Sequence, residues 1–350
     1  MCQTGPMTSS DTSPRTSQPA PHSPATIPDV READIICERL QHARQETSRI
    51  IFGQEKVISQ TLTAILAGGH ALLVGAPGLG KTLLVTTLGT VLGLDARRVQ
   101  FTPDLMPSDI TGSEILDEDA TGRRSFRFVP GPVFCQLLMA DEINRASPRT
   151  QSALLQAMQE RRVAIAGAEH PLPRPFHVLA TQNPLEQEGT YPLPEAQLDR
   201  FMLQIPLTFP DEQAERTMLL ATTGTQDALA QPVMTTEELM EAQALVRRLP
   251  VGEKIVDAIL ALVRAARPET SPDDTLRAQI AWGPGPRAAQ ALMLATRARA
   301  LLDGRLSPSL DDVIALARPV LAHRMALTFA ARAEGVRLDD VLTRLVNRLG

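Results

Sequence analysis

A glycine-rich segment that ends in lysine and threonine could hold the phosphates of a nucleotide. Residues 75–82 spell Gly-Ala-Pro-Gly-Leu-Gly-Lys-Thr and match the pattern GxxxxGK[ST]. The glycines of this pattern let backbone N–H groups close around phosphates at a helix N-terminus, where the helix dipole favours anions. Lys81 would reach the β- and γ-phosphates of ATP, and the Thr82 hydroxyl would hold Mg²⁺. The residues predicted to contact ATP here are Gly75, Ala76, Pro77, Gly78, Leu79, Gly80, Lys81, Thr82 and Leu83.

The flanking residues distinguish this segment from a chance glycine turn. The run 70–74 is short, apolar and bounded by glycines, as a buried parallel strand is, and 81–92 is predicted to be a helix. Strand, loop and helix in this order form the frame that the phosphate motif requires. A phosphate-binding loop, or P-loop, is therefore the preferred interpretation.

Two carboxylates follow another apolar run. Residues 137–140 are apolar and lead into Asp141 and Glu142. This arrangement would present Asp141 to Mg²⁺ and Glu142 to the water that attacks the γ-phosphate. Alone, such a run usually marks only a strand that leaves the core. The P-loop upstream favours the hydrolytic interpretation.

A polar side chain follows a third strand-like run, 177–181. At the carboxyl edge of a neighbouring strand, Asn183 could hydrogen-bond both Glu142 and the γ-phosphate. The alternative is that Asn183 and Pro184 form an ordinary turn.

Arg200 stands just before the last predicted strand. Its guanidinium could project from the rim of the sheet to the γ-phosphate of a neighbouring subunit, and such a finger can raise turnover by about 10³ to 10⁵. Arg200 could instead pair with Asp199 or Glu195 as surface charge. Arg145 and Arg149 are alternative candidates for the finger.

Arg287 opens a predicted helix in the C-terminal part of the chain, after Trp-Gly-Pro-Gly-Pro. From there it could reach back to the γ-phosphate of ATP bound to its own chain, or it could simply face solvent. The histidines show neither metal-ligand spacing nor a nucleophile-base arrangement, so no chemistry is assigned to them.

The elements that must position these residues predict an α/β fold. Five apolar runs alternate with helical stretches, which implies a parallel, doubly wound sheet; the runs are 70–74, 98–101, 136–140, 177–181 and 202–205. Two further segments, 110–130 and 162–175, show apolar residues at period two. Each is predicted to be a β-hairpin inserted into the core.

The chain is predicted to have three parts. Residues 1–28 are rich in Ser, Thr, Pro and Gln and are predicted to be a disordered tail. Residues 29–209 form the nucleotide-binding core, and 210–350 form a second, all-helical domain. Helix signals in that domain include a capping box at Thr235 and Glu238 and a start at Ser307-Pro308.

Composition narrows the class of protein. A net charge of -5 and a pI near 5.8 argue against a broad nucleic-acid surface, and 43% hydrophobic residues suffice for the cores of two domains. Three distant cysteines, an odd number without metal spacing, suit a reducing cytoplasm. No run of about 20 apolar residues could span a bilayer, and the N-terminus lacks the pattern of a signal peptide.

Taken together, the motifs resemble the MoxR-type AAA+ ATPases from about residue 51 to 324. The shared segments are Gly53-Gln54, Phe101 to Gly112, Gly131 to Phe134, Asp141 to Arg145, Ala180 to Pro184 and Tyr191 to Phe201. The resemblance implies an αβα core with two hairpin inserts and a helical lid, and it places Gly53, Gln54 and Arg287 at the ATP site. One departure is Gly-Pro-Gly-Pro before Arg287, where the family more usually has Gly-Ala-Ser-Pro.

Similarity to this family also implies partners. It suggests a ring, usually a hexamer, that binds ATP between subunits. It further suggests a von Willebrand factor A domain partner, with which the ring would assemble, activate or load metal into client proteins. The client itself is not evident from the sequence.

Three other functions stay open. A nucleic-acid motor would use a basic loop in the first insert, where the chain has Arg123, Arg124 and Arg127. A magnesium-chelatase-like motor subunit shares the same clade, although the Asn-Arg-Ala stretch after Glu142 and the chain length favour MoxR. A nucleotide-switched scaffold would more naturally lack Glu142, Asn183 or Arg200.

Overall fold

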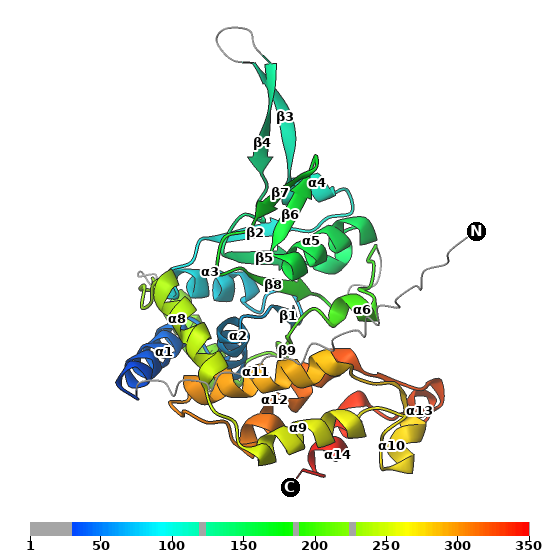
Figure 1. Cartoon of the computed structure of the whole chain (residues 1–350). Helices are drawn as coiled ribbons and strands as arrows, with labels where there is room; N and C mark the ends of the chain where they lie inside the picture. Colours follow the sequence, from blue (N-terminus) through cyan, green and yellow to red (C-terminus); the bar gives the residue numbers. More distant parts are fainter. Residues whose placement is uncertain (1–29, 119–123, 185–188, 224–228, 350) are drawn as a thin grey trace, which may run out of the picture.

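The computed structural model describes residues 30–118, 124–184, 189–223 and 229–349. The predicted disordered tail, 1–28, lies outside these residues. Figure 1 shows a layered α/β body with a long hairpin that projects from one side and a layer of helices on the other. None of the helices in the described ranges is long and apolar enough to cross a membrane.

Five parallel strands form the central sheet, in the order β2-β5-β8-β1-β9. They are β1 (Ala71–Val74), β2 (Ala96–Gln100), β5 (Leu137–Asp141), β8 (His177–Gln182) and β9 (Leu203–Pro206). The predicted parallel, doubly wound sheet is confirmed, with strand ends that differ by one or two residues. Since all five strands run the same way, their carboxyl ends share one edge of the sheet.

The side chains of the strands alternate between two hydrophobic clusters, as the period of two in a β-strand requires. On β5, Leu137 and Met139 belong to one cluster, whereas Leu138 and Ala140 belong to the other. Both faces of the sheet are therefore covered by helices. This double burial explains why the strands are near-continuous apolar runs.

The N-terminal half of the chain contributes three helices to the first cluster, which also includes helices of the C-terminal region: α1 (Val30–Ile50), α2 (Glu55–Leu66) and α3 (Lys81–Val91). The second cluster includes α5 (Pro148–Glu160), which begins at the N-cap Ser147. Shorter elements complete the core: α4 (Pro107–Thr111), the 3-10 turn η1 (Ile143–Arg145), α6 (Glu195–Leu198) and α7 (Glu212–Thr222).

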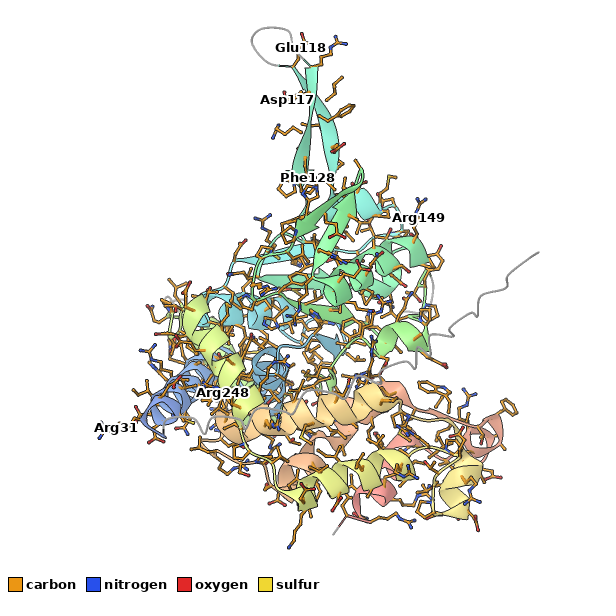
Figure 2. All side chains as sticks on the ribbon, viewed as in Figure 1. Arg31, Asp117, Glu118, Phe128, Arg149 and Arg248 are labelled. Atoms are coloured by element: carbon orange, nitrogen blue, oxygen red, sulfur yellow. The ribbon has the colours of Figure 1, made fainter. Side chains whose placement is uncertain are left out.

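Both predicted hairpins are present. The first pairs β3 (Gly112–Glu118) with β4 (Arg124–Pro130), and the second pairs β6 (Arg162–Ile165) with β7 (Ala168–Pro171). Phe128 stacks on His170 with ring centroids 4.0 Å apart, so the hairpins pack together near the base of the first. Asp117 and Glu118 lie toward its outer end (Figure 2).

The C-terminal region is predominantly helical, but two predictions about it require correction. It is not all-helical, because β10 (Ile280–Trp282) pairs antiparallel with β11 (Ala326–Leu327). The predicted start at Ser307 is also displaced, since the capping box forms at Ser309 and Asp312. The remaining elements are α8 (Thr236–Arg248), α9 (Glu253–Ala265), α10 (Asp274–Gln279), α11 (Pro286–Leu302), α12 (Leu310–Leu321), η2 (Ala322–Arg324), α13 (Phe329–Ala333) and α14 (Leu338–Val346).

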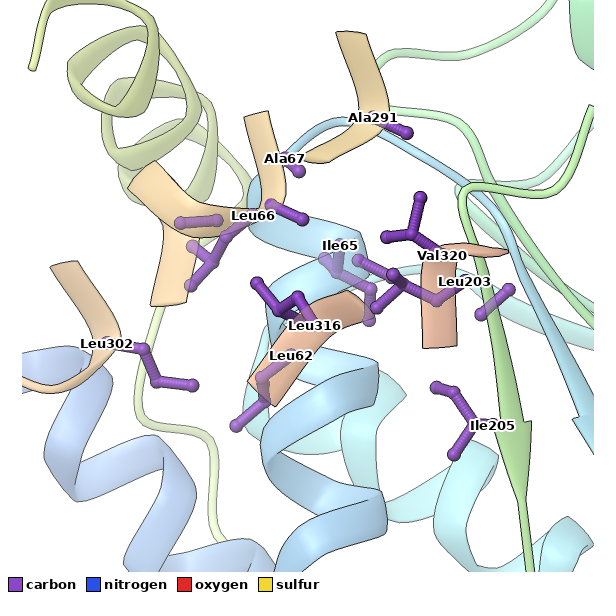
Figure 3. Close-up of a cluster of buried hydrophobic side chains, with 14 of the residues drawn as sticks. Leu62, Ile65, Leu66, Ala67, Leu203, Ile205, Ala291, Leu302, Leu316 and Val320 are labelled. Atoms are coloured by element: carbon purple, nitrogen blue, oxygen red, sulfur yellow. The ribbon is translucent and has the colours of Figure 1, made fainter. Parts of the chain in front are cut away.

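One hydrophobic cluster joins the sheet to the C-terminal helices. Figure 3 shows Leu62 and Ile65 of α2 close to Leu316 of α12, while Val320 of α12 lies beside Leu203 of β9. All five side chains are buried. Removal of this apolar area from water fixes α11 and α12 against one face of the core.

Three buried histidines bond backbone groups while neutral. His70 Nδ1 accepts from the Val178 N–H at 2.9 Å, and His177 Nδ1 donates to the Gly69 carbonyl at 2.8 Å. His323 Nε2 donates to a carbonyl at 2.9 Å. Burial lowers the pKa of His70 and of His323 to about 3, and that of His177 to about 4, from an ordinary value of 6.5.

These pKa values predict that acid weakens the fold. Above pH 6.5 all three are neutral whether the chain is folded or not, and their contribution to stability is fully present. As the pH falls toward 4, these histidines become protonated in the unfolded chain but stay neutral in the native state. Each histidine then removes about 1.4 kcal/mol from the free energy of unfolding per pH unit. Urea unfolding at pH 7 and pH 5 measures this loss.

Two variants check the cause of the loss. His70→Asn keeps an acceptor near the position of Nδ1 but does not titrate, so its stability is expected to fall less between pH 7 and 5. His42→Gln removes an exposed histidine and is expected to behave like the parent chain. Identical pH dependence in all three proteins would contradict the assignment.

Candidate active site

The P-loop connects β1 to α3 and depends on glycine at three positions. Gly78 and Gly80 have φ angles of 82° and 71°, in the left-handed region that favours glycine. At Gly75 the reason is space, because an added Cβ would lie 2.8 Å from the Cβ of Leu207. The loop can therefore approach β9 closely and turn its backbone N–H groups inward.

Two side chains donate hydrogen bonds to backbone carbonyls of the P-loop. Lys81 is buried, and its Nζ donates to the Gly75 carbonyl at 2.8 Å, which folds the ammonium group back over the loop. Gln54 Nε2 donates to the Leu79 carbonyl at 3.0 Å. The sequence predicted both residues at the ATP site, and both contact the loop.

A hollow of about 310 Å³ lies beside the P-loop. Its lining includes Gln54, Leu83 and several apolar side chains from before α2 and around α7, namely Ile50, Ile51, Phe52, Phe209, Pro210 and Met218. Gly53 stands close to α7, since an added Cβ would lie 2.4 Å from the Cβ of Ala214. The size and the apolar walls of the hollow suit the base of a nucleotide whose phosphates lie on the P-loop.

Asp141 ends β5 with both carboxylate oxygens engaged. Thr181 Oγ1 of β8 donates to Oδ1 at 2.6 Å. Arg98 of β2 donates to Oδ2 from both Nε and Nη2, at 3.1 and 2.6 Å. Asp141 is thus fixed from the strands on either side of its own. Both contacts cross the sheet at its carboxyl edge.

Glu142 has a left-handed backbone, with φ 55° and ψ 50°, which is unusual for a residue other than glycine. Its N–H donates to Thr181 Oγ1 at 2.8 Å. Its Oε2 accepts from Gln100 Nε2 at 2.8 Å and from Arg145 Nη1 at 3.0 Å. The sharp turn aims the carboxylate out of the strand direction and over the edge of the sheet.

The structure brings most predicted site residues to one edge. Thr82 follows the P-loop after β1, Asp141 and Glu142 lie at the end of β5, and buried Asn183 follows β8. These three strands are adjacent and parallel. The role of Asn183 as a γ-phosphate sensor stays a prediction.

Arg200 and Arg287 lie at the opposite edge. Both line a hollow of about 250 Å³ together with Gly69 and His70, which immediately precede β1. The P-loop begins at the other end of β1. Four extended residues span about 13 Å, so this length of strand separates the hollow from the P-loop. The structure therefore places Arg287 away from the P-loop of its own chain, and its role at the γ-phosphate stays a prediction.

The charged side chains that line this second hollow are mostly positive, which would favour an anion. Its charged lining consists of one carboxylate, Asp199, and four arginines, Arg161, Arg200, Arg287 and Arg324. Asp199 pairs with Arg324 at 2.7 Å and with Arg287 at 3.7 Å. Within the described ranges Arg200 forms no ion pair, so its predicted alternative partners, Asp199 and Glu195, do not neutralise it.

The rival arginines lie elsewhere. Arg145 contacts Glu142 of its own chain, at the carboxyl edge of the sheet. Arg149 is exposed in the first turn of α5 and points outward from the body (Figure 2). Which arginine serves as the main finger stays a prediction.

Three residues of the site were missed from the sequence: Arg98, Gln100 and Thr181. Each bonds a carboxylate or N–H of Asp141 or Glu142 across a strand boundary. A signal existed in the register, because parallel pairing of β2 with β5 sets Gln100 beside Asp141. That register cannot be read before the strand order is known.

Comparison with known proteins identifies the same two regions. A family model for ATPases associated with various cellular activities (AAA) matches residues 70–203, and an AAA lid domain model matches 275–345. Chaperone MoxR1 of Mycobacterium tuberculosis is 41% identical over 88% of this chain and 81% of its own length. Protein MoxR of Paracoccus denitrificans is 32% identical over 83% of this chain and 89% of its own.

Structural comparison agrees. A crystal structure of a protein from Cytophaga hutchinsonii superposes with a TM-score of 0.84 at 36% identity, and the match covers 91% of this chain and 96% of that one. The sheet order, the P-loop and the helical lid define a P-loop ATPase of the AAA+ class. The chain belongs to the MoxR family of that class. The division at residue 210 stays a prediction.

The contacts of Thr181 predict a change in turnover. Thr181→Val removes the hydroxyl that bonds both Asp141 and the Glu142 N–H, so ATP turnover is expected to fall about tenfold or more, as loss of about 1.4 kcal/mol implies. Thr181→Ser keeps the hydroxyl and is expected to stay near the parent rate. Phosphate release measures turnover, and equal rates in the two variants would contradict the assignment.

Proposed function

We propose that this protein is a Mg²⁺-dependent ATPase whose active sites form between subunits of a ring. One observation carries the proposal: the P-loop and the arginine hollow lie at opposite ends of β1. A chain of this shape cannot bring Arg200 to its own ATP. Head-to-tail contact between copies, in which one edge meets the other, generates a ring when the rotation from copy to copy closes.

The residues at the P-loop edge suit ATP and Mg²⁺. Lys81 and the loop N–H groups would bind the phosphates, and the hollow beside Gln54 would take the base. Thr82 and Asp141 supply a hydroxyl and a carboxylate, oxygen donors that Mg²⁺ prefers. When bound, Mg²⁺ neutralises charge on the phosphates.

Four side chains would carry the hydrolytic step. Glu142 would take a proton from the attacking water, and Asn183 would orient that water and the γ-phosphate. From the neighbouring subunit, Arg200 and Arg287 would stabilise the charge that develops on the transferred phosphoryl group. This division of labour ties turnover to assembly.

The wider function proposed is remodelling, assembly or activation of partner proteins in the cytoplasm. The name of the Mycobacterium tuberculosis relative, a chaperone, supports such a role. A hexameric ring and a von Willebrand factor A domain partner rest on the family resemblance. Metal loading into a client is one form that activation could take.

A nucleic-acid motor is the weaker alternative. Its expected feature is a basic first insert, but Arg124 pairs with Glu118 at 3.0 Å and Arg127 pairs with Asp117 at 2.8 Å. Arg123 lies outside the described residues. With its charges compensated internally, the described hairpin offers little attraction to phosphates. A magnesium-chelatase-like motor would share this site chemistry, but the MoxR relatives support the MoxR-type function.

Loss of the Glu142 carboxylate is expected to uncouple binding from turnover. Glu142→Gln should lower the rate of phosphate release by about 100-fold or more, while binding of a fluorescent ATP analogue stays unchanged. Parent turnover per subunit is expected to rise with protein concentration as rings form. Glu160→Gln, an exposed glutamate at the end of α5, is the matched control. Turnover by Glu142→Gln equal to that of the parent chain would contradict the proposed mechanism.

Mixing experiments test the arginines across the interface. Arg200→Ala and Arg287→Ala subunits are each expected to hydrolyse ATP poorly alone. Activity should return when either is mixed with Lys81→Ala subunits, because roughly a quarter of randomly formed interfaces then combine an intact P-loop with an intact arginine edge. Phosphate release from pre-mixed rings measures the recovery.

Two outcomes would revise this arrangement. Absence of recovery with Arg200→Ala would remove the role of Arg200 in trans. Recovery with Arg200→Ala but not with Arg287→Ala would leave Arg200 as the single finger of the pair. A mixture of Arg200→Ala with Arg287→Ala supplies the negative control, since neither partner restores a complete edge.

A further inference from the structure

A buried arginine of the lid binds the segment that carries the proposed finger. Arg324 of η2 is 3% exposed. Its Nη2 donates to the carbonyls of Asp199 and Phe201 at 3.2 and 2.7 Å, and its Nη1 donates to Met202 at 3.2 Å. These three residues flank Arg200 in the chain. The backbone on either side of Arg200 is thus held by one guanidinium.

The guanidinium of Arg324 is fully used. Besides these three bonds, its Nη1 donates to the Val320 carbonyl and its Nε donates to Asp199 Oδ1 at 2.7 Å. An arginine has five N–H donors in a rigid fork, and all five are engaged. Four of these five bonds join the lid to residues 199–202, and the neighbouring His323 adds a fifth, since its Nε2 also donates to the Phe201 carbonyl.

The contact between Arg324 and Asp199 determines which groups remain free for a ligand. Oδ1 of Asp199 is occupied by Arg324, and Oδ2 lies 3.7 Å from Arg287. Arg200, although adjacent in sequence to this carboxylate, has no ion pair with any residue in the described ranges. If Arg324 were absent, Asp199 could turn to Arg200 and neutralise it.

We propose that Arg324 is a positioning residue for hydrolysis in the neighbouring subunit. It clamps residues 199–202 to the lid and holds Asp199 away from Arg200, so that Arg200 keeps its charge available for the γ-phosphate across the interface. The inference rests on the proposed action of Arg200 in trans. It makes the lid of one subunit a determinant of turnover in the next.

Replacement of Arg324 by lysine tests the clamp. Arg324→Lys keeps the charge but has only three donors and no fork, so kcat is expected to fall about tenfold or more, with the Kd for a fluorescent ATP analogue unchanged. The loss should be rescued by mixing with Lys81→Ala subunits, as expected for Arg200→Ala. If Arg324 only stabilised the fold of its own subunit, mixing with Lys81→Ala subunits, which lack a working P-loop, would not restore turnover.

Two further variants keep the test decisive. Arg318→Lys makes the same change at an exposed pair with Asp339 and is expected to retain parent kinetics. His323→Ala removes one bond to Phe201 and should show the same pattern with a smaller loss, which covers the case in which Arg324→Lys does not fold.

The outcomes separate the clamp from the proposed function. Parent kcat in ring-forming Arg324→Lys, or in His323→Ala where the lysine variant is unfolded, would overturn the inference. So would a loss that mixing does not rescue while Arg200→Ala is rescued. Failure of Arg200→Ala itself to be rescued would remove the proposed action in trans and this inference with it.

Discussion

The common direction of the five strands is the constraint on which the rest of the molecule depends. A parallel sheet sorts the loops that follow its strands from the loops that precede them. Asp141 ends a strand and the P-loop and Glu142 follow strands, whereas Arg200 precedes β9. The rigidity of the sheet therefore separates the acidic, phosphate-binding edge from the basic edge. Each edge lacks what the other has, and this complementarity supports the proposed association of copies edge to edge.

Charge is distributed to preserve that complementarity. The arginines of the first hairpin, and Arg348 just after α14, pair with nearby carboxylates, as surface residues commonly do. The hollow beside Arg200 differs, because four arginines share a single carboxylate there. Like charges gathered at one place are unfavourable unless an anion completes the set. Retention of such a cluster at a subunit edge is consistent with a phosphate supplied from outside the chain.

Much of this site could be predicted because its chemistry is local. The P-loop is continuous in sequence, and Asp141 and Glu142 are adjacent, so strand and loop patterns sufficed for them and for the parallel sheet. The edge at which Arg287 lies could not be predicted, because it depends on how α11 packs, which follows from apolar contacts with α2 that no local pattern specifies. Arg98, Gln100 and Arg324 were missed for the same reason. Their partners lie 40 or more residues away and become neighbours only through strand order or lid packing.

The conformation of Glu142 depends both on its local sequence and on contacts with residues that are distant in the chain. Its left-handed backbone costs of order 1 kcal/mol or more for a residue with a Cβ. The bond from its N–H to Thr181 offsets part of that cost, and Gln100 restrains the carboxylate from β2. Three strands, β2, β5 and β8, must therefore keep register for one carboxylate to face the P-loop edge. A shift of β2 or β8 relative to β5 would break the bond from Gln100 or from Thr181, and Glu142 would lose one of the restraints that hold its strained backbone and its carboxylate.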